Sequence, residues 1–551
     1  MFFNSVESQY VFKVLIIFIS LKEIKNYSHM ILRNSIILSV FLAFLSCSIT
    51  SLKDENIQVI TQNGIVEGLV NNNSSLSEFF GIPYAKPPVN EFRWKEPQTL
   101  DNWEGIKETK QFAKRAVQTN IYGDMIYRSD TVSEDCLYLN IWTPDTGTDK
   151  KLPVLVYFHG GGFVAGTGNE PRYDGAKMAQ QGIVVVSVNY RLNIFGFLAH
   201  PELSEESPYK ASGNYGLLDQ VAALKWVNKN IAAFGGDTTK VSIAGESAGS
   251  ISVSMHMASP LSKNLLAGAI GQSGAAINPT FFPKPLNECE KEGVKFLEGT
   301  DYSSIADLRQ LSAQEISNLY VQSKRYGFPT VIDGYFLEKS LPKVFKAKEQ
   351  ANIPLLLGWT SAELSARAFM QGESLETENF KNKVKEKYPN NFEEVLNVYP
   401  HSTEKEIEQS ATDLASDDFI VYSTWKWFDL HRKYSKQPIY RYFFDQIKPN
   451  NQGLIGAPHA SDIEYLMGNL HLIPNIEWTP EDFYISETAV KYIANFIKTG
   501  NPNGDGLPYW ENANTEKINI PVMNTRNKLE YEDITDEQYF LLDKIYGNAS
   551  N

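Results

Sequence analysis

Two spacings of apolar residues alternate along this chain, one typical of strands and one typical of helices. Residues 154–158, in KLPVLVYFHGGG, form a run rich in β-branched residues that ends at glycines, as a strand does. GIVVVSVNYRL is a continuous Val-rich run, which is typical of a strand buried on both faces. DQVAALKWVNKNIAAF has apolar residues at helical spacing instead. The alternation predicts an α/β fold in which helices flank a mostly parallel central sheet.

Other short apolar runs, VIDGYF and IPLLLGW, are bounded by turn residues and are also predicted to be strands. KVSIAGESAGSISVSM predicts a strand, a glycine turn and a helix that starts at about Ala248, with Ser247 in the turn. The pattern G-x-S-x-G alone is weak, because it arises by chance about 0.2 times in a chain of this length. The strand and helix around it make the pattern more specific.

In such a strand–turn–helix unit the serine occupies a strained turn, called a nucleophile elbow. The flanking Gly245 and Gly249 are needed there because a Cβ at either position would clash with neighbouring backbone. The helix directs its free N–H groups and the positive end of its dipole towards the reacting oxygen. We therefore interpret Ser247 as a nucleophile.

A serine nucleophile needs an imidazole base, and the base needs a carboxylate that holds its tautomer. In α/β-hydrolases these follow in the order Ser, acid, His, and this order leaves the last four of the eight histidines as candidates. His401 begins a polar segment, His431 lies in a predicted helix beside charged residues, and His471 is an undistinguished loop residue. His459 follows the strand-like IYRYFF in a glycine-containing loop, from which it could reach over the sheet edge.

The acid should end a strand between the serine and the histidine. Glu363 lies six residues after the apolar run of IPLLLGWTSAEL, in a loop that we expect to begin at Gly358. Composition alone would make Glu363 a solvated loop carboxylate. HGGGF, residues 159–163, is a glycine run at a strand end and can supply fixed backbone N–H donors for an oxyanion.

Composition and charge remove several classes of function. The formal net charge is −14, with no polybasic cluster, so nucleic acid is not expected as a partner. Cys47, Cys136 and Cys289 are too far apart for a C-x-x-C zinc motif, no His is followed by Glu, and no Gly is followed by Lys. Zincins and P-loops are thereby excluded. The length of 551 residues suits one elaborated domain or three small ones.

The N-terminal region has the features of an export signal. From Met30, MILRNSIILSVFLAFLSCSIT has a short polar part, an apolar run and small residues around Cys47, so residues 30–47 are predicted to be a signal peptide. The apolar run is shorter than a membrane-spanning helix. Residues 1–29 are interpreted as an upstream extension from a mis-assigned start, with a genuine N-terminal tail as the alternative.

Cys47 at the end of the apolar run is similar to the lipobox of bacterial lipoproteins, in which the cysteine carries a lipid. FLSC fits that pattern imperfectly, and plain cleavage near Ser48 is the alternative. Either outcome predicts an exported protein. A lipid on Cys47 would anchor a periplasmic or outer-membrane lipoprotein to the membrane, whereas plain cleavage would give a secreted protein.

The motifs taken together resemble type-B carboxylesterases, the family that includes para-nitrobenzyl esterases and cholinesterases. The resemblance covers almost the whole mature chain and implies a single α/β-hydrolase domain over residues 55–545. Its motifs follow in the family's order: FFGIPYAKPPVNEFRW, SEDCLYLNIWTP, NYRLNIFGF, GNYGLLDQ, VSIAGESAG, IDGYFL, PLLLGWTSAE, GAPHASDIEYLMG and FIKTGNPNGDGLPYW.

The resemblance also implies a role for each site residue. Ser247 would be the nucleophile, His459 the general base and then acid, and Glu363 the carboxylate that orients the imidazole. Glu246 would be a buried carboxylate near that imidazole. No metal and no organic cofactor is expected. The oxyanion hole would be formed by three backbone N–H groups, those of Gly161, Gly162 and Ala248.

Several positions depart from the family's pattern. Family members often link the cysteine at Cys136 to one upstream, but Ala116 stands at that place, and Cys289 also lacks a partner nearby. Both are predicted to be free buried thiols. Thr360 replaces the usual Asn before the acid, which puts the hydrogen bonding of that loop in question.

The resemblance implies cleavage of small-molecule carboxylic esters through an acyl-enzyme. AVQTNIYGDMIYRSDTVS holds Tyr122 and Tyr127 but no Trp, so a site for a quaternary ammonium group is weakly supported. Phe163 could line the pocket or belong to the core. The alternatives are a catalytically silent adhesion or binding protein of the same fold, and a hydrolase of a specialised natural ester or amide. The oligomeric state is not predicted.

Overall fold

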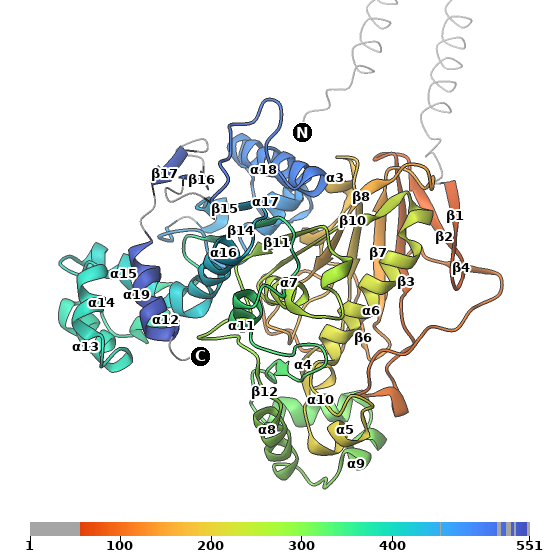
Figure 1. Cartoon of the computed structure of the whole chain (residues 1–551), viewed down its shortest axis with the longest axis horizontal. Helices are drawn as coiled ribbons and strands as arrows, with labels where there is room; N and C mark the ends of the chain where they lie inside the picture. The colour runs from red at the N-terminus through yellow and green to blue at the C-terminus, as the bar shows by residue number, and fades with distance from the viewer. Residues whose placement is uncertain (1–54, 452, 515–518, 525–529, 534–535, 548–551) are drawn as a thin grey trace, which may run out of the picture. The chain divides into compact units, whose positions relative to one another are not determined.

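A central sheet of thirteen strands runs through the computed structural model (Figure 1). The structure describes residues 55–451, 453–514, 519–524, 530–533 and 536–547. The predicted signal peptide and Cys47 lie outside these residues. Residues 56–551 form one compact unit. The strand order is β1 (Glu55–Thr61), β2 (Gly64–Asn71), β3 (Leu76–Pro83), β7 (Tyr138–Thr143), β9 (Val184–Val188), β8 (Leu152–Phe158), β10 (Gly236–Glu246), β11 (Gly268–Gln272), β14 (Leu355–Thr360), β15 (Ile439–Phe444), β16 (Asn519–Met523) and β17 (Glu530–Asp533), with β4 (Ile106–Glu108) paired to β2.

The middle of the sheet is parallel, and most pairs towards its two ends are antiparallel, although β4 pairs with β2 in parallel. Neighbouring strands from β9 through β8, β10, β11, β14 and β15 to β16 all pair in parallel. The pairs β2–β3, β3–β7, β7–β9 and β16–β17 are antiparallel. The prediction of a mostly parallel sheet is therefore confirmed, and the carboxyl ends of β10, β11 and β14 share one edge.

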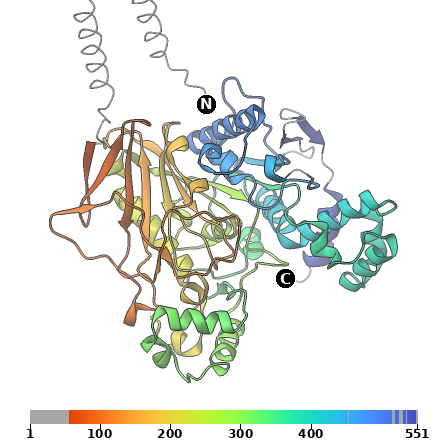
Figure 2. The same cartoon turned by 180° about the vertical axis from the view of Figure 1, so that it is seen from behind.

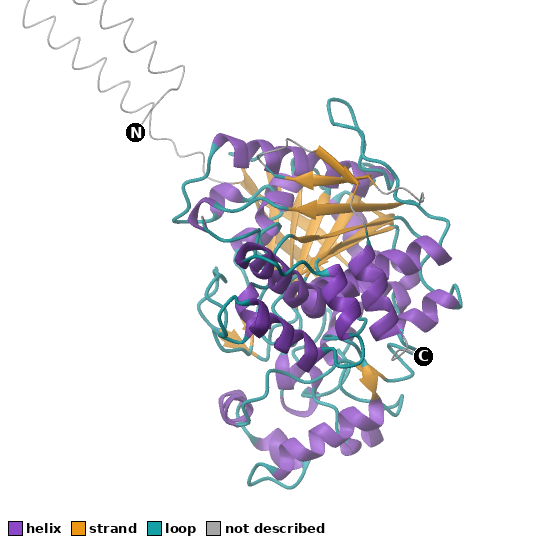
Figure 3. Ribbon diagram, turned by 90° about the vertical axis from the view of Figure 1, so that its left-hand side faces the viewer, coloured by secondary structure: helices purple, strands orange, loops and turns teal. Residues whose placement is uncertain are grey.

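Helices cover both faces of this sheet (Figure 3). Successive side chains of a strand point to opposite faces, so alternate residues enter different cores. Val156 joins a core cluster that contains Leu217 and Ile251, whereas its neighbour Leu155 joins a second cluster that contains Val490. Leu217 and Ile251 lie on α6 (Tyr215–Asn230) and α7 (Ala248–Ala258), and Val490 on α18 (Pro480–Thr499).

Two further groups of helices lie beside the sheet (Figures 1 and 2). One contains α8 (Leu286–Glu298), α9 (Ile305–Gln310) and α10 (Ala313–Gln322). The other packs around a third core cluster. It is built from α12 (Ala366–Met370), α13 (Thr377–Lys387), α14 (Phe392–Val398), α15 (Glu404–Ser416) and α19 (Glu537–Tyr546).

The remaining α-helices are mostly short. They are α3 (Ala176–Ala179), α4 (Asn193–Phe197), α5 (Pro201–Glu206), α11 (Leu341–Lys346), α16 (Tyr422–Tyr434) and α17 (Ile463–Met467). None of the helices in the described ranges is both long enough and apolar enough to cross a membrane.

The predicted strand VIDGYF is wrong for most of its length. Only Val331–Ile332 forms a strand, β13, which pairs with β12 (Lys284–Pro285) outside the central sheet. Asp333 Oδ1 accepts the backbone N–H groups of Tyr335 and Leu337, at 3.0 and 2.9 Å, and this folds the chain into a turn. The side chain thus competes with the strand for the same backbone donors.

Candidate active site

Ser247 lies in a sharp turn between β10 and α7. Its φ is 53° and its ψ is −120°, a strained conformation for a residue with a side chain, and it is 7% exposed. A Cβ at Gly245 would lie 2.4 Å from the carbonyl carbon of Gly249, and a Cβ at Gly249 would lie 2.0 Å from the backbone oxygen of Phe158. Only glycine therefore allows the strand and helix to approach each other here, as the sequence argument required.

Glu363 is buried three residues after β14. Its Oε1 accepts hydrogen bonds from Ser273 Oγ at 2.6 Å and from the Thr360 N–H at 2.8 Å. Its Oε2 lies 2.5 Å from His459 Nδ1. Because every oxygen has a partner, the carboxylate is held in one orientation although it is only 2% exposed. A solvated loop carboxylate, the alternative suggested by composition, is contradicted by this burial.

Two details of the Glu363 turn differ from expectation. Gly358 lies inside β14, opposite Tyr442. The loop does not begin at Gly358, because the strand continues to Thr360. The hydrogen bond that holds Glu363 comes from the backbone of Thr360. The Thr360 hydroxyl is buried without a hydrogen-bond partner among the described residues.

His459 is brought to Glu363 by a link between two loops. Ala362 and Pro458 form an isolated parallel bridge, in which the Ala362 N–H donates to Ala457 O at 3.0 Å. Ser361 Oγ accepts the Ala457 N–H at 2.8 Å. The loop after β14 and the loop after β15 are therefore tied together next to the catalytic candidates.

The imidazole of His459 lies between two buried carboxylates. Nδ1 faces Glu363, and Nε2 lies 3.1 Å from Glu246 Oε1. Burial alone would lower the pKa of His459, but the charges of Glu246 and Glu363 raise it to about 9. Burial raises the pKa of Glu246 to about 8, although the imidazole works against that rise. Glu246 is thus the buried carboxylate near the imidazole that the resemblance implies.

Ser247 Oγ does not yet engage the imidazole. Within the described part of the chain this oxygen forms no hydrogen bond, while the serine N–H donates to Gln272 O at 2.9 Å. Ser247 follows Glu246 directly, so the elbow and His459 meet at one place. Catalytic hydrogen bonds are often loose without substrate.

The glycine loop after β8 lies against this elbow. A Cβ at Gly160 would be 2.5 Å from Glu246 Oε2 and 3.3 Å from Ser247 Cβ. Gly161 and Gly162 have φ values of 103° and 62°, which favour glycine. The N–H groups of these two residues have no acceptor among the described residues. The N–H of Ala248 has no partner inside α7, because Ala248 is the first helical residue.

Sequence reasoning missed two residues that support the site. His159 lies 2.8 Å, through Nδ1, from Gly160 O, and its ring stacks on Tyr190 at 4.3 Å. Burial lowers the pKa of His159 to about 4, so the ring is neutral and its Nδ1–H can hold the peptide plane that carries the Gly161 N–H. The position of His159 as the first residue of HGGGF was a sequence signal that could have indicated this role. Nothing in GQSG pointed to Ser273.

The other residues that the sequence raised lie elsewhere. His401 precedes α15, His431 is buried within α16, and His471 lies in a 3-10 turn, Leu470–Leu472. Phe163 is 5% exposed and packs on Phe197, with ring centroids 4.9 Å apart, so it belongs to the core.

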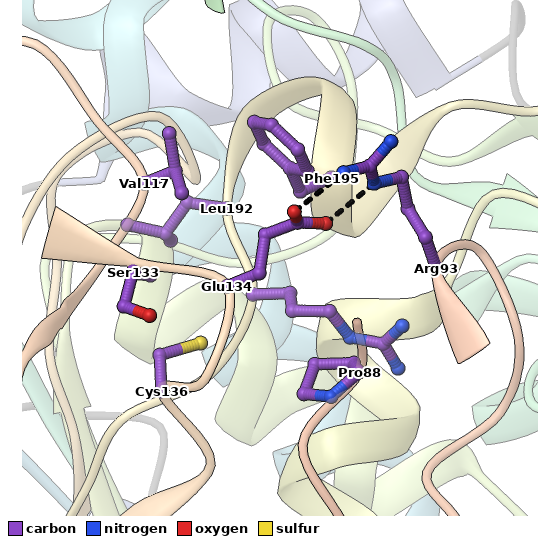
Figure 4. Close-up of a pocket in the computed structure, with 10 residues that line it drawn as sticks. Pro88, Arg93, Val117, Ser133, Glu134, Cys136, Leu192 and Phe195 are labelled. Carbon is purple, nitrogen blue, oxygen red and sulfur yellow. Dashed lines mark hydrogen bonds and ion pairs between the residues drawn. The ribbon is translucent and has the colours of Figure 1, made fainter. Parts of the chain in front are cut away.

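Both described cysteines are free and buried, as predicted. Cys136 lines a cavity of about 10 Å³ (Figure 4). Ala116, the position from which a disulfide partner would come, lines the same cavity. The ion pair of Arg93 with Glu134 crosses the same cavity, with the two atoms of its shortest contact 2.6 Å apart (Figure 4). None of the residues that line this cavity belongs to the Ser247 site.

Comparisons with known proteins agree on one family. A model of the carboxylesterase family matches residues 55–540. Para-nitrobenzyl esterase of Bacillus subtilis (strain 168) is 33% identical over 487 residues, which cover 85% of this chain and 93% of that protein. Fumonisin B1 esterase of Sphingopyxis macrogoltabida is 34% identical over 426 residues, 74% of each chain. A solved structure of PNB esterase matches with a TM-score of 0.74 and 30% identity, covering 88% of this chain and 98% of that one.

Proposed function

The chain belongs to the carboxylesterase family and hydrolyses carboxylic esters, and we propose that it does so through an acyl-enzyme on Ser247. His459 Nε2 accepts the proton as Ser247 Oγ attacks the ester carbonyl carbon. Glu363 keeps the other ring proton on Nδ1 and stabilises the imidazolium that forms. The tetrahedral oxyanion is held by backbone N–H groups, those of Gly161, Gly162 and Ala248.

Collapse of this intermediate breaks the bond to the alcohol oxygen, which takes the proton from His459. Water then gives a proton to His459 and attacks the acyl carbon, and the second intermediate releases the carboxylic acid and restores Ser247. In the free protein Nε2 faces Glu246, so the imidazole must shift its contact from Glu246 to Ser247 Oγ when an ester binds. Glu246 remains close enough to stabilise the positive ring.

The observation that carries this proposal is the arrangement of Glu363. A buried carboxylate with hydrogen bonds from Ser273 Oγ and the Thr360 N–H, placed 2.5 Å from His459 Nδ1, fixes one tautomer and one ring orientation. A protein that only bound a partner would not need an imidazole oriented beside a serine in a strained turn.

Release of p-nitrophenol from acetate, butyrate and octanoate esters tests the proposal, with the Ser247→Ala protein as the control. We expect the substitution to lower kcat at least about 10⁴-fold, while circular dichroism shows an unchanged fold. Hydrolysis that survives in Ser247→Ala would contradict the assignment of the nucleophile. A folded wild-type protein without activity on any ester would favour the binding-protein alternative.

The natural substrate is proposed to be a bulky ester. Two of the relatives are named for fumonisin B1 and para-nitrobenzyl esters and two more for pyrethroids, while others are named for fatty acyl-CoA and acylcarnitine. Comparing p-nitrophenyl butyrate with the matching p-nitroanilide separates ester from amide cleavage. We expect the ester to be strongly preferred, and comparable rates would place the protein among amide hydrolases.

We also propose that the protein is exported, with residues 30–47 removed as a signal peptide. The support is the sequence pattern around Arg33 and Cys47. Mass spectrometry of the mature N-terminus distinguishes the outcomes. A lipid-modified Cys47 would indicate a lipoprotein, a free Ser48 would indicate plain cleavage, and an N-terminus at Met1 would contradict export by this signal.

A further inference from the structure

Two loops that are distant in sequence meet over the glycine loop. One, residues 117–131, joins β5 (Arg115–Ala116) to β6 (Val132–Ser133), and the other, residues 323–330, joins α10 to β13. Tyr122 from the first and Tyr326 from the second bring their hydroxyl oxygens to 2.5 Å. The hydrogen bond links residues 204 positions apart, so it joins two loops that are far apart in the sequence.

This tyrosine pair rests on a proposed oxyanion donor. A Cβ at Gly162 would lie 2.0 Å from the Tyr326 hydroxyl oxygen and 3.0 Å from that of Tyr122. Both hydroxyls therefore occupy the space beside Gly162 that a side chain would fill. An ester whose carbonyl oxygen reaches the Gly162 N–H must place one of its two substituents beside the pair.

Aromatic rings continue from the pair to the catalytic base. The ring of Tyr326 lies 6.5 Å from that of Phe281, Phe281 lies 5.9 Å from Phe419, and Phe419 meets His459 edge to face at 5.1 Å. The leaving alcohol must be within reach of His459 to take its proton, which places it at the Phe419 end. The acyl group is then left at the tyrosine end.

The first loop is anchored on either side of Tyr122, and the second is anchored at the backbone of Tyr326 itself. Gln118 exchanges two hydrogen bonds of 2.8 Å with the backbone of Gly166, and Arg172 binds Asp124 at 2.8 Å. Tyr320 donates its hydroxyl to Tyr326 O at 2.7 Å. The Tyr326 residue is 55% exposed. The hydroxyl pair can therefore part by side-chain movement while the loops keep their anchors.

We propose that Tyr122 and Tyr326 form a latch on the acyl side of the site, closed for short acyl groups and opened by long ones. The inference rests on the proposed function of Ser247 and adds the residues that set acyl length. Burial raises the pKa of both hydroxyls, so they stay protonated across the pH range in which His459 titrates.

The test measures kcat/KM for p-nitrophenyl acetate and octanoate in Tyr122→Phe, Tyr326→Phe and the double variant. Each single variant should raise the octanoate-to-acetate ratio about 2- to 10-fold, the value of one hydrogen bond, because a long acyl group no longer has to break it. The double variant should add nothing further. Tyr127→Phe, which removes a hydroxyl in the same loop that contacts Met125 Sδ at 3.2 Å, is the control and should leave the ratio unchanged.

An unchanged ratio in variants that still hydrolyse acetate would overturn the latch and leave the catalytic proposal intact. A response to alcohol length, measured with ethyl and octyl acetate, in place of acyl length would overturn the placement at the acyl end. Calorimetry of octanoate binding compares the wild-type protein with Tyr122→Phe without any turnover. Tighter binding to Tyr122→Phe supports the latch even in a protein without esterase activity, and equal binding argues against it.

Discussion

The turn after β14 and the end of β10 each place a buried carboxylate against the same imidazole, but they do so in different ways. Glu363 is fixed by two hydrogen bonds and lies 2.5 Å from His459 Nδ1. Glu246 approaches Nε2 at 3.1 Å, and its Oε1 has no hydrogen bond among the described residues. An oriented carboxylate defines a tautomer, whereas an unpartnered one acts mainly through its charge.

The difference follows from burial and satisfaction of polar groups. A buried carboxylate without hydrogen bonds is expensive to ionise, and its pKa rises, as it does for Glu246. We infer that Glu363 holds the base in place and that Glu246 sets the pH at which the base works. Four substitutions test this separation of roles.

The largest effect is expected for Glu363→Gln. The amide keeps the size of the side chain but cannot stabilise the imidazolium, and its NH₂ group can impose the wrong tautomer. We expect kcat for p-nitrophenyl butyrate to fall about 10³- to 10⁴-fold with little change in thermal stability. A loss below tenfold would mean that Glu246 can replace Glu363, and the separation would fail.

Glu246→Gln should shift the pH profile. Only the neutral imidazole accepts the serine proton, so kcat/KM rises with pH through the pKa of His459, which the two carboxylates raise to about 9. Removing one charge lowers that pKa and moves the rising part of the profile towards acid by about one pH unit. At a pH below this rise, kcat/KM should therefore increase roughly tenfold. Profiles from pH 5.5 to 10 check this, and a rise that stays in place would assign the raised pKa to Glu363 alone.

Ser273→Ala removes one of the two hydrogen bonds that orient Glu363. The carboxylate keeps the Thr360 N–H, so we expect a loss of about 3- to 10-fold in kcat, corresponding to about one hydrogen bond. Combined with Glu363→Gln, the substitution should have almost no additional effect. Full additivity in this double-mutant cycle would show that Ser273 acts independently of Glu363.

The smallest effect is expected for Thr360→Val. The Thr360 hydroxyl is buried without a partner, whereas the N–H that binds Glu363 belongs to the backbone and is kept. The isosteric change should leave activity within about twofold and raise the free energy of unfolding by up to about 1 kcal/mol. Urea unfolding measures the stability, and a clear loss of activity would reveal a role for the hydroxyl.

Local patterns were sufficient for the parts of the site that depend on short-range geometry. GESAG between a strand and a helix predicted the elbow, because the close approach at Gly245 and Gly249 is encoded within a few residues. The parallel middle of the sheet could be predicted for the same reason, since continuous Val-rich runs suit strands buried on both faces. The turn at Asp333 was missed because its side-chain hydrogen bonds override the apolar pattern.

Long-range contacts set the rest. Glu363 looked like a solvated loop residue, and its burial depends on Ser273 at the end of β11 and on the bridge between Ala362 and Pro458. The family resemblance identified Glu363, while spacing alone did not. The contact of Tyr122 with Tyr326 joins two irregular loops, and no periodicity in either loop indicates it.

The central claim is that Ser247 carries the acyl group, and covalent labelling tests it most directly. A p-nitrophenyl alkylphosphonate, which mimics the tetrahedral intermediate, should release one equivalent of p-nitrophenol and leave its phosphonyl group on the peptide that contains Ser247. Ser247→Ala should remain unlabelled by mass spectrometry. An adduct on another residue, formed in step with loss of esterase activity, would contradict the account.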